Sequence, residues 1–175
     1  TNTALTLGAV TLGGNSTLRA GNRTIGVGAV TGGGFNLAAY TAGATTFNGA
    51  MAGVNALTTD AGGTTTAQNA VSTTSVNFGD AATLNGASIT TTGNQDYTTL
   101  NLGTNVLLNS GAGSITTAGL VTGAGNNLTI QGSGTDTIAA TAAINSLTLN
   151  KSGGTITFIG NTSQTSLATA GNNFN

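Results

Sequence analysis

Apolar residues alternate with threonine or another small polar residue in short runs along the chain, and Gly, Asn or Ser residues separate the runs. The pattern is clearest where residues 128–134 (LTIQGSG) realign on residues 147–153 (LTLNKSG) at a shift of about 19. The alternation predicts a strand with one apolar face, and the Ser-Gly that follows predicts a turn. One such unit cannot bury its own apolar residues, so copies must stack. The sequence therefore predicts an all-β solenoid with coils of roughly 19 residues.

No significant helix is predicted. The strongest helical candidate is the alanine-rich run at 38–57, but Gly43, Gly49 and Gly53 interrupt it. A helix there would lose roughly 1 kcal/mol for each glycine. We therefore expect strands in this run as well.

The alternation also predicts which side chains fill the interior of the coils. The Thr and Ser residues between them are expected to face outward, including those in the runs 64–66 and 90–92. The predicted interior residues are Leu5, Leu7, Ile25, Val27, Val76, Phe78, Leu100, Leu102, Leu128, Ile130, Leu147, Leu149, Ile156 and Phe158.

A longer repeat is superimposed on the coils. Residues 30–37 align with residues 121–128 at a shift of about 91, which predicts a single solenoid segment, 1–175, made of two related blocks at approximately 1–91 and 92–175. Residues 171–175 read on into residues 1–8 resemble the internal passage 93–103. We therefore expect one period of a longer tandem array, or a subunit that meets its neighbour head to tail.

The composition argues against nucleic acid as a partner and against membrane insertion. Only 4% of residues are charged, and there is no Cys, Pro, His or Trp. Binding of nucleic acid needs a Lys/Arg surface, whereas this chain has only Arg19, Arg23 and Lys151. The apolar runs are far shorter than the ~20 residues that cross a bilayer, so membrane insertion of this segment is not expected. Scarce charge suits a solenoid, because like charges stacked on successive coils would repel.

Catalytic chemistry is not expected. General acid–base or nucleophilic catalysis needs paired carboxylates, His or Cys held close together. Asp60, Asp80, Asp96 and Asp136 are assigned to separate coils, where we expect them to serve turns and edge solubility. We therefore predict a protein that is not an enzyme and has no catalytic, cofactor-binding or metal-binding residues.

Two stretches resemble known binding motifs but have simpler explanations. Residues 131–139 match most of a calcium-binding nonapeptide, but such sites need consecutive copies, and the next coil has Thr155 in place of the acid. The threonine runs suggest an ice-binding face, but a regular Thr-x-Thr does not recur in every coil. Strand-forming threonine explains these runs without a ligand.

Some motifs resemble a known family. Residues 92–97 (TGNQDY), 100–103 (LNLG) and 145–149 (NSLTL) are similar to degenerate repeats of bacterial filamentous-haemagglutinin-type proteins and related autotransporter adhesins. The resemblance implies a right-handed parallel β-helix that is secreted to the cell surface as a stalk or fibre.

These observations lead to one expected function and three alternatives. We expect a structural extracellular protein that forms a bacterial surface or biofilm-matrix fibre through head-to-tail association with itself, since neither end carries the charge or Pro that blunts a strand edge. One alternative is a stalk or ligand-binding segment of an adhesin that recognises host or surface glycans. Minor alternatives are an ice-binding solenoid and an amyloid-like matrix protein whose strands pair between chains.

Overall fold

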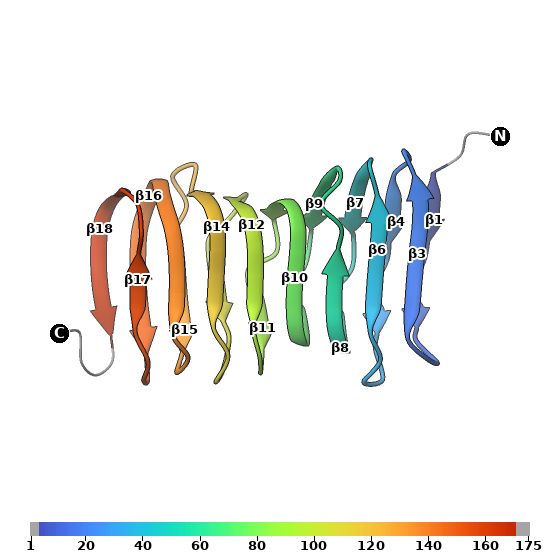
Figure 1. Cartoon of the computed structure of the whole chain (residues 1–175), viewed down its shortest axis with the longest axis horizontal. Coiled ribbons are helices and arrows are strands. Elements are labelled where there is room, and N and C mark those ends of the chain that lie inside the picture. Colours follow the sequence, from blue (N-terminus) through green and yellow to red (C-terminus); the bar gives the residue numbers. More distant parts are fainter. Residues whose placement is uncertain (1–3, 171–175) are drawn as a thin grey trace.

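The chain coils into a rod whose wall is one continuous sheet of parallel strands (Figure 1). The computed structural model describes residues 4–170. This part of the chain forms an 18-stranded sheet and contains no helix. In Figure 1 the chain advances from right to left while the front strands β3 (Ser16–Gly21) and β6 (Leu37–Thr41) run upward, which is a right-handed coil. The predicted all-β class and right-handed parallel β-solenoid are confirmed.

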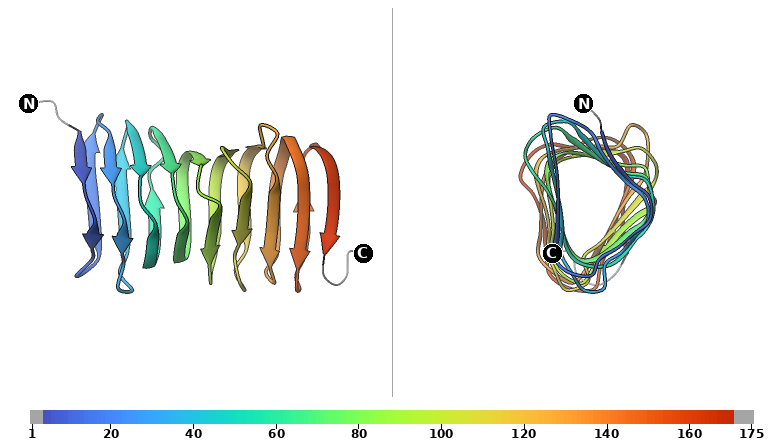
Figure 2. Two further views of the ribbon diagram at one scale, coloured as in Figure 1. Left: turned by 180° about the vertical axis from the view of Figure 1, so that it is seen from behind. Right: turned by 90° about the vertical axis from the view of Figure 1, so that its right-hand side faces the viewer.

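Seen along its axis, the rod is a rounded triangle (Figure 2). The strand registers define three walls, which we call A, B and C in chain order. Wall A includes β1 (Leu5–Leu7), β4 (Ile25–Val27), β7 (Ala44–Phe47) and β9 (Thr64–Ala67). Wall B includes β2 (Val10–Thr11), β5 (Val30–Thr31), β11 (Ser88–Thr91), β13 (Val106–Asn109) and β15 (Leu128–Gly132). Wall C includes β3, β6 and β17 (Ile156–Phe158).

The remaining strands bend at corners and serve two or three walls each. The pairing register shifts at bends, as between Phe78 and Ala81 or between Tyr97 and Leu100, because the corner leaves residues unpaired. The bent strands are β8 (Met51–Thr59), β10 (Val71–Leu84), β12 (Gln95–Leu102), β14 (Ile115–Thr122), β16 (Asp136–Lys151) and β18 (Thr162–Ala170).

The length of each coil can be measured along a column, by which we mean the residues that pair in register on successive coils. We use one column of wall A whose side chains face the interior. From Leu5 to Thr162 the column takes eight steps, each of 17 to 21 residues. With strands about 4.8 Å apart, eight steps give a rod about 40 Å long. The predicted coil of roughly 19 residues is confirmed, and Leu128 pairs with Leu147 in the register that the repeat indicates.

The repeat of about 91 residues does not correspond to a whole number of coils, so equivalent residues lie in different walls. Val30 lies in wall B, whereas its sequence equivalent Val121 lies in wall A. Likewise Leu37 lies in wall C and Leu128 in wall B. The division into two related blocks stays a prediction, and the junction expected from residues 171–175 and 1–3 lies outside the described residues.

Most of the predicted interior is confirmed. Ten of the predicted residues are buried: Ile25, Val27, Val76, Phe78, Leu100, Leu102, Leu128, Ile130, Leu147 and Leu149. Leu5, Leu7, Ile156 and Phe158 are only half-buried, because they lie in the outer coils of the described rod. The ring of Phe47 in wall A packs on that of Phe78 in wall C, and Phe78 packs on Tyr97 of the next coil, with centroids 6.4 Å and 5.9 Å apart.

The expectation that threonine faces outward is wrong for part of the chain. The middle residue of each predicted outward run is inside, with Thr65 0% and Thr91 2% exposed. Some interior hydroxyls find a partner at a corner, as where Thr91 donates to the carbonyl of Gly93 at 2.5 Å, whereas the hydroxyl of Thr65 has none. The buried threonines are Thr41, Thr45, Thr59, Thr65, Thr73, Thr91, Thr117 and Thr141.

Candidate functional site

A hollow of about 480 Å³ lies on the outside of the rod where wall B turns into wall C. Three successive coils line it through Asn109, Gln131 and Asn150, which pair in register. They form an amide ladder on the outer face, because alternate residues of each strand point away from the interior. The hydroxyl-bearing residues Ser133 and Ser152 also line the hollow. Amides and hydroxyls both donate and accept hydrogen bonds, so the hollow suits a neutral polar ligand.

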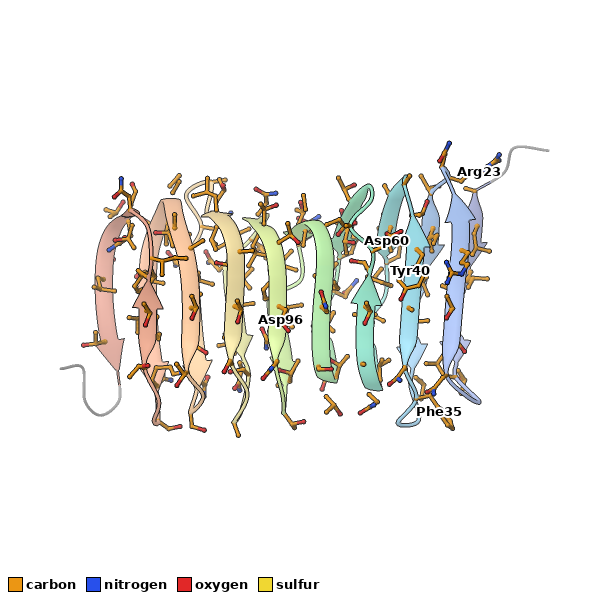
Figure 3. All side chains as sticks on the ribbon, viewed as in Figure 1. Arg23, Phe35, Tyr40, Asp60 and Asp96 are labelled. Carbon is orange, nitrogen blue, oxygen red and sulfur yellow. The ribbon has the colours of Figure 1, made fainter. Side chains whose placement is uncertain are left out.

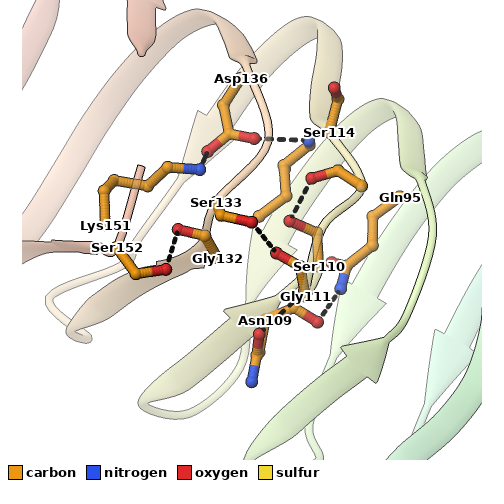
Figure 4. A network of polar contacts seen from close by, with 12 residues as sticks. Gln95, Asn109, Ser110, Gly111, Ser114, Gly132, Ser133, Asp136, Lys151 and Ser152 are labelled. Carbon is orange, nitrogen blue, oxygen red and sulfur yellow. Dashed lines mark hydrogen bonds and ion pairs between the residues drawn. The ribbon is translucent and has the colours of Figure 1, made fainter. Parts of the chain in front are cut away.

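Lys151 borders the same hollow but turns its side chain inward (Figure 4). Its Nζ lies 2.6 Å from Oδ2 of Asp136, and the two side chains are 3% and 0% exposed. Asp136 opens β16 in wall C, and Lys151 closes the same strand in wall B after most of one circuit. A buried ion pair costs the hydration of both charges, so removal of one partner is far more harmful than loss of a surface pair.

The second carboxylate oxygen of Asp136 is also engaged. Oδ1 accepts a 2.7 Å hydrogen bond from the backbone N–H of Ile115, one coil earlier. Both oxygens therefore point into the protein, and the calcium alternative for residues 131–139 does not fit this aspartate. The expectation that the aspartates serve turns and surface solubility is wrong for Asp136 and for Asp80, which is 4% exposed.

Gln95 continues the polar interior. It occupies a wall C column between Val76 and Ile115, where neighbouring coils place aliphatic side chains. Its Nε2 donates to the carbonyl oxygen of Asn109 at 2.8 Å, and its Oε1 accepts from the hydroxyl of Tyr97 at 2.9 Å. Burial, with a smaller contribution from the charge of Asp96, raises the pKa of the Tyr97 phenol.

Asp80 and Asp60 lie near the corner between walls C and A. Burial raises the pKa of Asp80, the nearby hydroxyls of Thr65 and Thr59 oppose this shift, and the charge of Asp60 adds to it. Thr59 donates to Oδ1 of Asp80 at 3.2 Å. Burial also raises the pKa of Asp96, against a hydrogen bond from Thr116.

The four aspartates lie in separate coils, as predicted; Figure 3 labels Asp60 and Asp96. In residues 4–170, no group of three or more His, Cys, Asp or Glu is placed to hold a metal ion. The buried polar groups are mainly engaged with other groups of the protein, so the outer hollow is the better candidate for contact with a ligand.

No family model matches the chain, and no curated protein or solved structure matches it. The resemblance to filamentous-haemagglutinin-type repeats therefore stays a prediction. Within the part of the chain that the structure describes, no helix is long and apolar enough to cross a membrane.

Sequence reasoning missed the polar residues of the interior, although a signal was present. Lys151 follows Leu149 by two positions, and Gln95 precedes Tyr97 by two, so each shares the inward side of its strand. Asp136 has the same relation to Ile138. Extending the alternation to charged and amide residues would have placed all three inside.

Proposed function

We propose that this chain is a structural segment of an extracellular fibre on a bacterial surface or in a biofilm matrix. The observation that carries the proposal is that the wall A column from Leu5 to Thr162 continues in register through eight steps of the coil. Each coil is held mainly by its two neighbours through backbone pairing and stacked side chains, so such a rod lengthens by adding coils. Its role would be stiffness and reach.

The outer coils of the described rod support a continuation in both directions. Leu5, Val10 and Leu18 at one end, and Ile156 and Phe158 at the other, pack on the core yet stay only partly buried. In the final described coil Leu167 is 54% exposed, although it continues the column of Leu128 and Leu147. Further coils would bury these side chains, whether they belong to the same longer chain or to another copy.

Electron microscopy of the chain and of a tandem dimer tests the fibre proposal. We expect rods or filaments whose length grows by about 40 Å for each added copy, with fibre diffraction near 4.8 Å along the axis. A dimer that folds into two separate bodies joined by a flexible linker would contradict the proposal. Short single rods that do not associate would restrict it to continuation within one chain.

A second candidate is glycan recognition through the outer hollow. The amide ladder of Asn109, Gln131 and Asn150 supports it, because amides can both donate to and accept from sugar hydroxyls. A glycan array followed by calorimetry tests this role. Binding that weakens at least about tenfold in Gln131→Ala, corresponding to about 1.4 kcal/mol, and persists in Asn101→Ala would support it. Asn101 is a fitting control because it is exposed on the outside of wall A.

The ice-binding alternative has weaker support. Thr46, Thr66 and Thr83 align on the outside of wall A, but the same column continues as Gly26 and Asn101. A thermal-hysteresis measurement with Thr66→Val, which keeps the shape and removes the hydroxyl, tests it. The amyloid-like alternative needs pairing between chains, whereas the described strands pair within one chain.

A further inference from the structure

We propose that Lys151 and Asp136 join in an intramolecular amide bond between the lysine Nζ and the aspartate Cγ. The two side chains form the buried ion pair described above, with Nζ 2.6 Å from Oδ2. The bond would be made by the folded chain itself, without a cofactor or a second protein. This inference does not depend on the proposed fibre role.

Proximity of the two groups favours the bond. The fold holds an amine and a carboxyl group in contact, with side-chain exposures of 3% and 0%. Reactions between groups fixed in this way proceed as if the partner were present at concentrations on the order of 10⁵ M or more. Burial also favours the product, because an amide carries no charge, whereas the ion pair keeps two charges out of water.

The orientation of the carboxyl group also favours the bond. The N–H of Ile115 donates to Oδ1 at 2.7 Å, while Nζ approaches the other oxygen. When Nζ adds to Cγ, negative charge develops on Oδ1. A backbone N–H already aimed at this oxygen stabilises the tetrahedral intermediate, as an oxyanion-hole donor does.

The step balances without an added reagent. A proton passes from Nζ to Oδ2 along their hydrogen bond, which yields a neutral amine and a carboxylic acid. The amine lone pair attacks Cγ, and a second proton moves from Nζ to Oδ2. The Cγ–Oδ2 bond then breaks, one water molecule leaves, and the Nζ–Cγ amide remains. Lys151 lines the outer hollow, which gives the water a short route to solvent.

The cross-link would fasten the coil at its B–C corner. Asp136 and Lys151 are 15 residues apart and enclose most of one circuit of the rod. A covalent bond across this segment limits the unfolded chain and prevents the coil from unwinding while the bond is intact.

Mass spectrometry of the intact native chain is the first test. We expect a mass lower than that of the sequence by one water molecule. Trypsin digestion after denaturation locates the change, because the chain contains only Arg19, Arg23 and Lys151 as cleavage sites. A free Lys151 gives fragments 24–151 and 152–175. An acylated Lys151 resists cleavage and gives the single fragment 24–175.

Two variants serve as controls. Lys151→Arg keeps the positive charge and the trypsin site, and Asp136→Ala removes the electrophile. Both should show the full mass and complete cleavage after residue 151. A native chain of full mass that is cut after Lys151 would overturn the proposal. A chain that lacks one water yet is still cut there would also overturn it, since the loss would then come from imide formation elsewhere. The native chain alone decides, even if a variant does not fold.

Discussion

The hydroxyl of Tyr97 donates a 2.9 Å hydrogen bond to the side-chain oxygen of Gln95 inside wall C. Gln95 is 0% and Tyr97 3% exposed, so water cannot replace either partner. The amide of Gln95 also bonds to the carbonyl oxygen of Asn109, which connects wall C with the corner that ends β13. Gln95 thus occupies a position that aliphatic side chains fill in neighbouring coils, and its polar pair with Tyr97 links wall C to the adjacent corner.

Removal of either partner of this pair should lower the free energy of unfolding by more than loss of one hydrogen bond at the surface would. We expect Tyr97→Phe and Gln95→Leu each to lower the free energy of unfolding by about 1–3 kcal/mol, because a buried polar group is left without its partner. The double variant should lose less than the sum of the two. Urea unfolding of the four proteins measures this coupling, and strictly additive losses would show that the hydrogen bond contributes nothing.

The buried phenol predicts a loss of stability in alkali. The pKa of Tyr97 is raised above its ordinary value of 10.0, so the folded protein holds this proton more tightly than the unfolded chain does. The contribution to stability is complete below pH 10.0 and is lost as the pH rises above it toward the folded pKa. Unfolding free energy measured across this range should fall in the native chain. Tyr97→Phe should remove this part of the slope, and an unchanged slope would contradict the assignment.

Alternation of apolar residues was enough to predict stacked strands with an apolar interior. Leu128 and Leu147 could be paired from sequence because both lie in strands that repeat the same side-chain pattern one coil apart. The wall to which a strand belongs was not predictable. Val30 and Val121 occupy similar sequences in walls B and A, since all three walls demand the same inward apolar residues.

The polar interior was also missed, for a different physical reason. Alternation indicates the side to which a residue points, whereas the sequence does not show which hydrogen-bond partner will be there. Lys151 becomes acceptable inside only because Asp136 lies 2.6 Å away, and Thr91 because the carbonyl of Gly93 is nearby. Such partners are set by the register between coils and by the corners.

Asp80 should destabilise the folded chain at neutral pH. Burial raises its pKa above the ordinary value of 3.8, so its contribution to stability is complete below pH 3.8 and is lost as the pH rises through the folded pKa. Asp80→Asn removes the charge and keeps an acceptor for Thr59. We expect it to gain about 1 kcal/mol at neutral pH and to show little difference from the native chain below pH 3.8.

Thermal unfolding at several pH values checks this expectation for Asp80. Asp96→Asn is the matched control, because Asp96 is half-buried and should give a smaller gain. A loss of stability in Asp80→Asn at neutral pH would mean that the hydrogen bond from Thr59 stabilises the carboxylate of Asp80 more than burial destabilises it.

Replacement by alanine should cost more stability at Gly63 than at Gly34 or Gly13. Comparing the three sites distinguishes the cost of backbone strain from the cost of steric overlap. Gly63 has φ of 75°, and an added Cβ would overlap the carbonyl oxygen of Gly43 in the preceding coil. Gly34 has φ of 82° with no atom near the added Cβ, and Gly13 has open space without a positive φ. We expect Gly34→Ala to cost about 1–2 kcal/mol from backbone strain and Gly13→Ala to stay within about 0.5 kcal/mol.

Gly63→Ala should lose clearly more than Gly34→Ala, because the corner must move away from the coil on which it stacks. Thermal unfolding followed by circular dichroism ranks the three variants. Equal losses for Gly63→Ala and Gly34→Ala would show that corners yield readily and that spacing between coils is set by the strands alone. The expected order would instead identify backbone contact at the corners as a constraint on coil spacing, and hence on the length of any fibre built from these coils.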